Sequence, residues 1–562
     1  MKKSKKFSSL LICSLIVLWV LLLSPGSQAA EPKALDTGYK VVRLVKDTPF
    51  PGCNGAVIGQ DGALYVVHTG TGQISRIDLK TNKLSSFVPP YGGTYITDDI
   101  TADDKGNFYV TGTTALVGEV YRIDRNGLKT VIARPADFEG MTAPNGIQYN
   151  KRTGRLFMSE CFWANRVFEL DPTGAKKPKL LVKENVIHTP EGFDFDRDTN
   201  DLIIPDMGTG KIVRVNPDTG DVKTIAEGFT APIALKVGKD NKAYFPEFGG
   251  NVYRLSLDGQ KKEKLAQLAP GLDNLAITPE GRLFITSYWN ATVYEVSTDG
   301  SGKFKTLFPT GPNQIAGAVF KNGKLLVGDF IMIRSTEKNQ YVPTKINAWA
   351  AHGCPLVCGL ADGPGDQVLW SDWVGNSVAI GNPSTGEFKA VAGQLKWPMA
   401  VLMNPKEPKI YVAEYGAGQI TEVSLTDGAK KALATGLEGP VGLALIDNKL
   451  YVAEAKPGRI SKVDLATGKT EVFLSGAVGR VGPLANDGKG NLLALDGASG
   501  RLFRINPKKP ALSVVAENIP VSYGLVGSYP TLELPVVMTV DAKGNIYIPT
   551  SERGLIELER KK

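Results

Sequence analysis

The chain has 562 residues, of which 42% are hydrophobic and 22% are charged, and its formal net charge is +8. This length exceeds what one hydrophobic core usually serves, so several domains or a repeat array are expected in a soluble globular protein. The basic residues are scattered along the sequence, without a basic helix or zinc-finger spacing, which argues against a nucleic-acid-binding protein.

The N-terminus has the three parts of a secretory signal peptide, predicted over residues 1–29. A basic start, MKKSKK, precedes the apolar run LLICSLIVLWVLLL, and Ser27 and Ala29 then provide small residues at the −3 and −1 positions of a cleavage site. An uncleaved membrane anchor is the alternative. No later segment is long and apolar enough to span a bilayer. The sequence therefore predicts an exported protein, either extracellular or in the periplasm or cell envelope.

After the signal, the chain consists of about twelve copies of one unit, each of roughly 40–47 residues. Examples are GALYVVHTGTGQISRIDLKTNKLSSFV and NKLYVAEAKPGRISKVDLATGKTEVFL. Strand-like alternation between Gly, Asn and Asp turns predicts four antiparallel strands per copy, and this period is typical of a β-propeller blade. The fold class expected is all-β, with tandem β-propellers.

Two six-bladed rings are preferred over one twelve-bladed ring, which would have a very wide channel. The expected domains are 38–311 and 312–562, divided at the Gly311–Pro312 break. The last copy ends without its outermost strand. Residues 39–47, in GYKVVRLVKD, are predicted to supply that strand and to close the chain.

The position at which each inner strand enters the channel differs between the two halves. In copies one to six it is occupied by Asn54, Asp98, Asn145, Glu191, Ile233 and Asp273, and in copies seven to twelve by Ala316, Cys358, Met399, Val441, Gly482 and Val536. The next position adds Asp99 and Asn274 in the first half only. Turn capping is the alternative explanation for any single Asn or Asp, but it should apply equally to both halves. The first channel entrance is therefore expected to be polar and the second apolar.

Several carboxylates facing one another need a counter-charge, and a bound cation would supply it. Mixed carboxylate and amide oxygens favour Ca²⁺ over Mg²⁺, whereas Zn²⁺ prefers His or Cys ligands. The predicted calcium ligands come from Asn54, Asp98, Asn145, Glu191, Asp273 and Asn274.

The motifs resemble two propeller families. APNGIQYNKRTGRLFMSE and GLDNLAITPEGRLFITS resemble the gluconolactonase and paraoxonase group, and GPVGLALIDNKLYVAE resembles NHL-type and streptogramin-lyase-like repeats. The first resemblance covers most of residues 50–310 and implies a catalytic divalent ion held by Glu, Asn, Asn and Asp. In the blade order of that group, with the blades rotated, these are Glu191, Asn274, Asn54 and Asp98, while Asn145 falls on a blade that the group skips.

This resemblance implies a calcium-dependent lactone or ester hydrolase. His188, three residues before Glu191, is the preferred general base, with Asp98 as a second catalytic candidate; His68 and His352 are expected to have packing or surface roles. Glu160, Asp206 and Glu247 end second strands in the first half. Comparable positions in the apolar half are held by acids as well, namely Asp329, Asp372, Glu414, Glu454 and Asp496, so all of these acids are interpreted as a repeat feature that accepts hydrogen bonds from turn amides.

Other features leave alternatives open. The aromatic residues Phe162, Trp163, Tyr288 and Trp289 either contact a ligand at the rim or pack between blades. The four cysteines Cys53, Cys161, Cys354 and Cys358 allow three disulfide pairings. Two other functions remain, a non-catalytic binding protein with a structural calcium and a streptogramin-lyase-like eliminase. The expected partners are a small lactone or ester, or a protein bound through the second propeller, with no nucleic acid and no membrane beyond the signal.

Overall fold

The computed structural model describes residues 30–46, 48–69, 71–89, 97–114, 117–138, 143–161, 164–313, 315, 317–347, 357, 359–373, 375–521, 525–526, 529–530, 537–551 and 553–561. The predicted signal peptide lies outside these residues. Within them, the strands form eleven four-stranded sheets, one five-stranded sheet and one two-stranded sheet, with a single 3₁₀ turn, η1 (Pro135–Asp137). The described residues contain no helix long and apolar enough to cross a membrane. The all-β prediction is confirmed.

Twelve of these sheets are the blades of a β-propeller fold, numbered 1–12 here in chain order. Blades 1–6 consist of β3 (Ala56–Ile58), β4 (Leu64–Val67), β5 (Ile74–Ile77) and β6 (Leu84–Val88); β7 (Thr97–Ala102), β8 (Phe108–Thr114), β9 (Val117–Ile123) and β10 (Lys129–Ala133); β11 (Pro144–Asn150), β12 (Arg155–Glu160), β13 (Val167–Leu170) and β14 (Lys179–Val182); β15 (Asp194–Phe195), β16 (Leu202–Asp206), β17 (Lys211–Val215) and β18 (Val222–Ala226); β19 (Lys236–Val237), β20 (Lys242–Pro246), β21 (Asn251–Ser256) and β22 (Lys262–Gln267); and β23 (Leu272–Ile277), β24 (Leu283–Ser287), β25 (Thr292–Val296) and β26 (Phe304–Thr306).

The second half of the chain repeats this pattern. Blades 7–12 consist of β27 (Gly317–Lys321), β28 (Lys324–Asp329), β29 (Met332–Glu337) and β30 (Gln340–Asn347); β31 (Gly359–Asp362), β32 (Val368–Asp372), β33 (Ser377–Gly381) and β34 (Phe388–Ala392); β35 (Pro398–Met403), β36 (Lys409–Glu414), β37 (Gln419–Ser424) and β38 (Lys430–Ala434); β39 (Pro440–Ile446), β40 (Lys449–Glu454), β41 (Arg459–Asp464) and β42 (Thr470–Ser475); β43 (Val481–Asn486), β44 (Leu492–Asp496), β45 (Arg501–Ile505), β46 (Leu512–Glu517) and β1 (Lys33–Ala34); and β49 (Thr539–Val540), β50 (Ile546–Pro549), β51 (Leu555–Arg560) and β2 (Tyr39–Val45). The two-stranded sheet pairs β47 (Leu525–Val526) with β48 (Tyr529–Pro530).

Local sequence explains these hairpins. Gly154, at φ 73°, turns β11 into β12, and Asn448, at φ 61°, turns β39 into β40. Both residues occupy the left-handed region that Gly and Asn tolerate best. All four residues of β4, LYVV, are buried, because the inner strands of a blade are covered on both faces by neighbouring blades. The aromatic cluster of Tyr65, Phe87 and Phe108 is one such contact between blades 1 and 2.

The N-terminal strand completes the last blade, as predicted. β2 pairs with β51 over its length, from Tyr39 opposite Arg560 to Val45 opposite Leu555. The strand lies within the range predicted for the first domain, 38–311, yet it belongs to the last sheet, because the last copy lacks an outer strand of its own. β1 adds a fifth strand to blade 11, which the sequence did not predict. Blades 1–6 are therefore inserted between β2 and β27.

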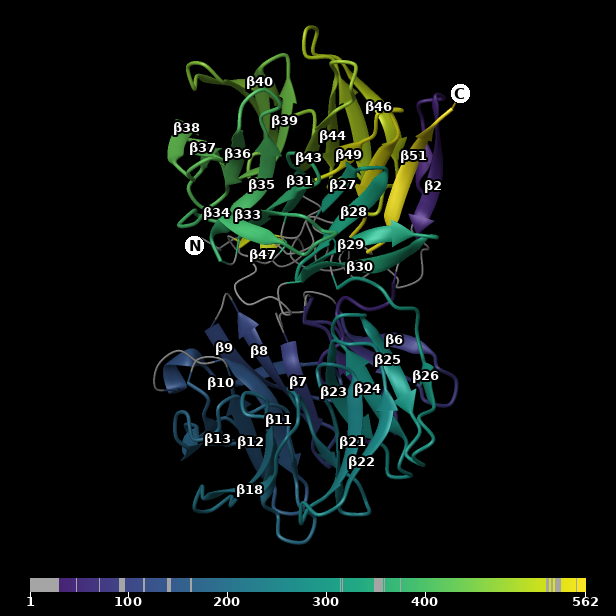
Figure 1. Ribbon diagram of the computed structural model, residues 1–562, viewed down its shortest axis with the longest axis vertical. Coiled ribbons are helices and arrows are strands. Elements are labelled where there is room, and N and C mark those ends of the chain that lie inside the picture. Colours follow the sequence, from purple (N-terminus) through teal and green to yellow (C-terminus); the bar gives the residue numbers. More distant parts are fainter. Residues whose placement is uncertain are drawn as a thin grey trace, which may run out of the picture.

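The blades gather into an N-terminal body (blades 1–6) and a C-terminal body (blades 7–12), stacked end to end (Figure 1). In the N-terminal body, β3 contacts β7 and β7 contacts β11; β15, β19 and β23 follow, and β23 contacts β3 again. In the C-terminal body, contacts run from β27 through β31, β35, β39 and β43 to β49, which contacts β27. Each body thus joins its last inner strand to its first.

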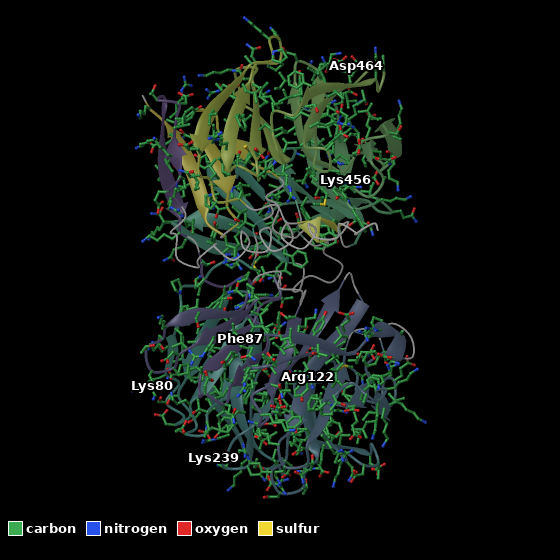
Figure 2. All side chains as sticks on the ribbon, turned by 180° about the vertical axis from the view of Figure 1, so that it is seen from behind. Lys80, Phe87, Arg122, Lys239, Lys456 and Asp464 are labelled. Carbon is green, nitrogen blue, oxygen red and sulfur yellow. The ribbon has the colours of Figure 1, made fainter. Side chains whose placement is uncertain are left out.

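The inner strands of both bodies begin at the interface between them. In Figure 2, Lys239, which follows inner strand β19, lies at the far end of the N-terminal body, so β19 begins at the near end. Lys456 follows β40, which is antiparallel to inner strand β39, and it lies on the side of the C-terminal body that faces the N-terminal body, whereas Asp464 lies on the far side. The two strand-entry ends, called here the N-mouth and the C-mouth, therefore face each other.

Candidate metal centre

The polar residues predicted at the first channel entrance converge at the N-mouth. Asn54, Asn145 and Glu191 are buried, with exposed fractions of 5%, 7% and 4%. Asp98 and Asp273 are half-buried. The carboxylates of Asp98 and Asp273 both act electrostatically on Glu191, and Asn145 offers it a hydrogen bond. Residues from blades 2, 3, 4 and 6 thus share one electrostatic environment, although up to 175 positions separate them along the chain.

Burial and mutual repulsion disfavour ionisation of these acids. Burial, reinforced by the charges of Asp98 and Asp273, raises the pKa of Glu191 well above its ordinary value. Burial and the neighbouring Asp99 raise the pKa of Asp98 to about 7. The pKa of Asp273 is raised well above its ordinary value by burial and by Asp98. Such a group of acids is a natural site for a cation, whose charge would offset both effects.

Just inside the N-mouth, a hydrogen-bonded pair crosses between blades 2 and 6. Asn274 Nδ2 donates to Asp99 Oδ1 at 2.9 Å, and Asn274 Oδ1 accepts from the Leu275 amide at 2.8 Å. Both side-chain groups of Asn274 are therefore engaged within the protein. The sequence predicts Asn274 as a calcium ligand, and this stays a prediction; the structure shows that its side chain also links blade 6 to Asp99 of blade 2.

Small residues make room for this pair. The equivalent positions in blades 1, 3, 4 and 5 are Gly55, Gly146, Gly192 and Ala234. A Cβ on Gly55 would lie 2.5 Å from the Asp99 Cα, and a Cβ on Gly192 would lie 3.4 Å from Asn274 Nδ2. The pattern of four small residues with one Asp and one Asn is the sequence signal for this layer.

Replacing Asp99 with Asn should destabilise the N-terminal body by about 2–3 kcal/mol, because a buried amide would face donors on every side. Asp99 is fully buried and accepts from the amides of Ile100 and Ile147 as well as from Asn274. Chemical denaturation would measure the change. The control is Asp104→Asn, at an exposed acid after β7. A loss below about 0.5 kcal/mol for Asp99→Asn would contradict this account of the pair.

The donor set at the N-mouth has the chemistry of a hard-cation site. Asn54 Nδ2 donates to Thr69 Oγ1 at 3.2 Å, but its buried Oδ1 has no hydrogen-bond partner. Amide and carboxylate oxygens of this kind are calcium ligands. Among the described residues, His, Cys, Asp and Glu do not form a group of three that could hold a metal by themselves. A cation at the N-mouth would therefore need the amides of Asn54 and Asn145 as well as the carboxylates.

The histidines differ in their surroundings. His68 is fully buried, stacks on Phe50, and bonds Gly52 O at 3.0 Å and Ser75 Oγ at 2.8 Å. Burial lowers the pKa of His68 to about 3, so it is a neutral packing residue, as predicted. The His188 side chain is 61% exposed, and its Nδ1 lies 3.7 Å from Asp206 Oδ2. His188 thus borders Asp206, which ends β16, while Glu191 is buried in the mouth. His352 lies outside the described residues.

The acids that end second strands are a repeat feature, as the sequence predicted. Glu247 accepts from the Thr230 amide at 2.6 Å, Glu454 from Glu438 at 2.6 Å and Asp496 from Arg480 at 2.9 Å. In each case the donor belongs to the loop that leads into the inner strand. These acids fix the loop conformation in both bodies.

Cys53 and Cys161 are buried free thiols and are not paired with each other. Burial, with the charges of Glu191 and Asp98, raises the pKa of Cys161. The thiol therefore lies close to the acids of the N-mouth and stays protonated. Cys354 and Cys358 lie outside the described residues, as do Phe162 and Trp163.

The C-mouth is apolar where it is described. Met399 and Val441 are buried in one cluster with Val478 and Val481, and Trp397 packs against it. Ala316, Cys358 and Val536 lie outside the described residues. Met399 and Val441 place buried apolar side chains at two of the entrance positions, and the contrast between the two entrances as a whole stays a prediction.

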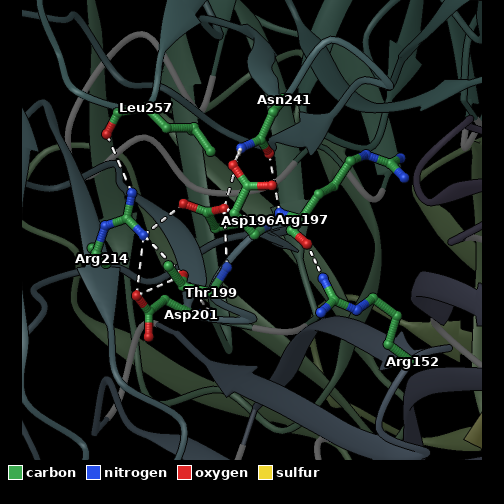
Figure 3. Close-up of polar contacts among 9 residues, drawn as sticks. Arg152, Asp196, Arg197, Thr199, Asp201, Arg214, Asn241 and Leu257 are labelled. Atoms are coloured by element: carbon green, nitrogen blue, oxygen red, sulfur yellow. Dashed lines mark hydrogen bonds and ion pairs between the residues drawn. The ribbon is translucent and has the colours of Figure 1, made fainter.

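The other end of the N-terminal channel holds a cavity of about 500 Å³ lined by apolar residues such as Ile58, Phe195 and Ile277 together with charged and polar residues. Lys236, 6% exposed, donates to Gln148 Oε1 at 2.9 Å. Burial raises the pKa of Asp99, and the charge of Lys236 offsets part of this rise. At its rim, Arg197 donates to Gly238 O at 2.7 Å. Arg152 donates to Arg197 O (Figure 3), so the two contacts tie blades 3, 4 and 5 together. These groups bond one another, so this end is a structural network. Sequence reasoning missed Lys236 because it lies beyond the aligned entrance position.

Comparison with known proteins gives a partial match. No protein-family model matches the chain. Gluconolactonase from Zymomonas mobilis subsp. mobilis is 25% identical over 176 residues, covering 27% of this chain and 48% of that enzyme. The chain thus spans about half the length of this curated relative. The predicted resemblance to gluconolactonases is confirmed at this level.

Comparison with solved structures gives matches at low identity and low TM-score. A streptogramin B lyase has a TM-score of 0.38 at 16% identity, covering 54% of this chain and 96% of its own. A structural-genomics target assigned to the gluconolactonases has a TM-score of 0.37 at 17% identity, and the match covers 50% of this chain and 99% of that target. A GH74 enzyme from Niastella koreensis has a TM-score of 0.42 at 10% identity, and the match covers 93% of this chain and 99% of that enzyme.

Proposed function

We propose that the protein is an exported, calcium-dependent hydrolase of lactones or esters that acts at the N-mouth. Each body is taken as a six-bladed ring, supported by the contacts of β23 with β3 and of β49 with β27. The observation that carries the function is the set of buried acids around Glu191, together with the unpartnered Asn54 Oδ1. The gluconolactonase similarity supports the lactone class.

In this proposal Glu191, Asp98, Asp273, Asn54 and Asn145 hold the calcium ion. The ion would polarise the substrate carbonyl and favour the negative charge that develops on its oxygen. Asp99 and Asn274 hold the layer beneath it. Asp98 is also the carboxylate proposed to accept a proton from water. Its pKa of about 7, raised by burial and by Asp99, describes the site without the cation, and bound calcium would lower it. His188 serves as base only if its exposed side chain turns from Asp206 to the mouth.

A binding protein with a structural calcium is the second candidate. It is favoured by the position of His188 beside Asp206, because no histidine base then lies at the mouth among the residues that the structure describes. The eliminase alternative is weakened by the apolar C-mouth, which carries the streptogramin-lyase-like repeats.

The test is hydrolysis of a panel of lactones and aryl esters by metal-free and calcium-loaded protein. We expect hydrolysis that is lost in a chelator and restored by added calcium, because the carbonyl is activated only with the cation in place. Hydrolysis unaffected by the chelator would contradict the calcium mechanism. No hydrolysis, with calcium still raising the melting temperature, would favour the binding protein.

A further inference from the structure

Two chain segments cross between the bodies beside the N-mouth. Residues 46–55 lead from β2 into β3, and residues 307–316 lead from β26 to β27. They lie against each other, since a Cβ on Gly311 would meet Thr48 Cγ2 at 2.3 Å. Residues of the C-terminal body reach the same region: Arg553 Nη2 donates to Thr48 O at 2.7 Å, and Arg334 donates to Trp289 O.

Unpartnered buried polar atoms gather at this junction. Asn313 is 5% exposed, and neither Oδ1 nor Nδ2 of its side chain has a hydrogen-bond partner. Asn54 Oδ1, Thr48 Oγ1 and Trp289 Nε1 are also buried without partners. Native proteins satisfy nearly all buried polar groups, so a group of exceptions at one place needs an explanation. A ligand that both donates and accepts hydrogen bonds would satisfy them.

Asn313 lies within reach of the candidate metal centre. A Cβ on Gly52 would lie 3.0 Å from Asn313 Oδ1 and 3.5 Å from Tyr288 Cε2, so the three residues are neighbours, and Asn54 follows two positions later. Tyr288 lies within electrostatic range of acids from both bodies. Burial raises its pKa, and the carboxylates of Asp329 in the C-terminal body and Asp273 in the N-terminal body raise it further. The amide of Asn313 therefore lies beside Gly52, on the segment that leads to Asn54 of the N-mouth.

We propose that Asn313 is a substrate-positioning residue of the N-mouth, contributed by the segment that crosses into the C-terminal body, and that its amide binds ring hydroxyl groups of the lactone. This rests on the proposed function. A hydroxyl group donates and accepts at once, which matches the donor and the acceptor of a carboxamide. A lactone without ring hydroxyls would leave the amide unpaired. In this proposal the C-terminal body contributes to substrate binding, because it anchors the segment that holds Asn313.

The test compares Asn313→Leu with Asn404→Leu. Asn404 is also 5% exposed but is fully engaged, since Nδ2 donates to Tyr411 Oη at 2.9 Å and Oδ1 accepts from the Lys406 amide at 2.8 Å. Leu has the same branching as Asn, with two methyl groups in place of the amide oxygen and nitrogen, although it is larger. We expect Asn313→Leu to keep or raise the melting temperature, because it removes unpaired polar groups, while Asn404→Leu lowers it.

Kinetics then separate a positioning role from a structural one. With calcium-loaded protein, Asn313→Leu should raise KM for a sugar δ-lactone at least about 10-fold and leave an unsubstituted δ-lactone within about 2-fold. Asn404→Leu should leave KM unchanged for both lactones. An equal effect of Asn313→Leu on both lactones, or none on either, would overturn the inference, and so would a lowered melting temperature. A wild type that hydrolyses neither lactone would overturn the proposed function and the substrate named here. The melting temperatures of the two variants would still show whether the Asn313 amide lacks hydrogen-bond partners in the folded protein.

Discussion

The Glu191→Gln variant should bind calcium at least about 100-fold more weakly than the wild type. Glu191 is buried at the centre of the N-mouth, where the charges of Asp98 and Asp273 reach it. Removing its charge leaves the cation without a carboxylate ligand from blade 4, and losses at the ligands themselves exceed the 10–100-fold typical of their supporting residues. Calorimetric titration of metal-free protein with calcium would measure the change.

Glu247→Gln is the matched control for this variant. Glu247 is 3% exposed, close to the 4% of Glu191, but it bonds the Thr230 amide and Asn251 Nδ2 at the end of β20. The control should keep its calcium affinity within about 2-fold even if its melting temperature falls, because it removes a loop contact and no ligand. Equal calcium affinity in Glu191→Gln and the wild type would remove Glu191 from the site.

Stabilisation by calcium should grow as the pH rises from 5.5 to 8. Without metal, the raised pKa values of Glu191, Asp98 and Asp273 mean that the folded protein binds more protons than the unfolded chain in this range. Stability of the metal-free protein therefore falls as these groups ionise. For Asp98, the change from 3.8 to about 7 amounts to on the order of 4 kcal/mol when fully ionised. Bound calcium reverses the direction of this pH dependence, because calcium binds the ionised forms of these acids.

Thermal melts of metal-free and calcium-loaded protein at both pH values would test this. At pH 8 and about 100-fold excess over Kd, calcium should add about 2.7 kcal/mol, or about 5–10 °C for bodies of this size. At pH 5.5 the difference should be several-fold smaller. A difference that is equal at both values, or larger at pH 5.5, would show that the acids of the N-mouth do not hold the ion.

Much of the fold could be predicted because each blade carries its own turn chemistry. Residues such as Gly154 and Asn448 mark the hairpins, and the missing outer strand of the last copy identified β2 as its partner. The strand β1 could not be predicted, because two residues carry no periodic signal. The order of contacts that joins β23 to β3 depends on tertiary packing beyond any single repeat.

The site was predictable in part. Aligning one position across all copies found Asn54, Asp98, Asn145, Glu191 and Asp273, because equivalent positions of a repeat meet at one end of a channel. It could not show that Asn274 turns inward to Asp99, since this depends on space left by the small residues of other blades. Nor could it show that the N-mouth faces the C-terminal body, which brings Asn313 to its rim.

The most direct test of the central claim is an anomalous difference map from crystals of the protein grown with calcium. The proposal predicts one strong peak at the N-mouth, about 2.3–2.6 Å from oxygens of Glu191, Asp98, Asp273 and the Asn54 amide, with loss of the peak in Glu191→Gln crystals. A fully occupied calcium ion elsewhere, with water or nothing between these acids, would contradict it.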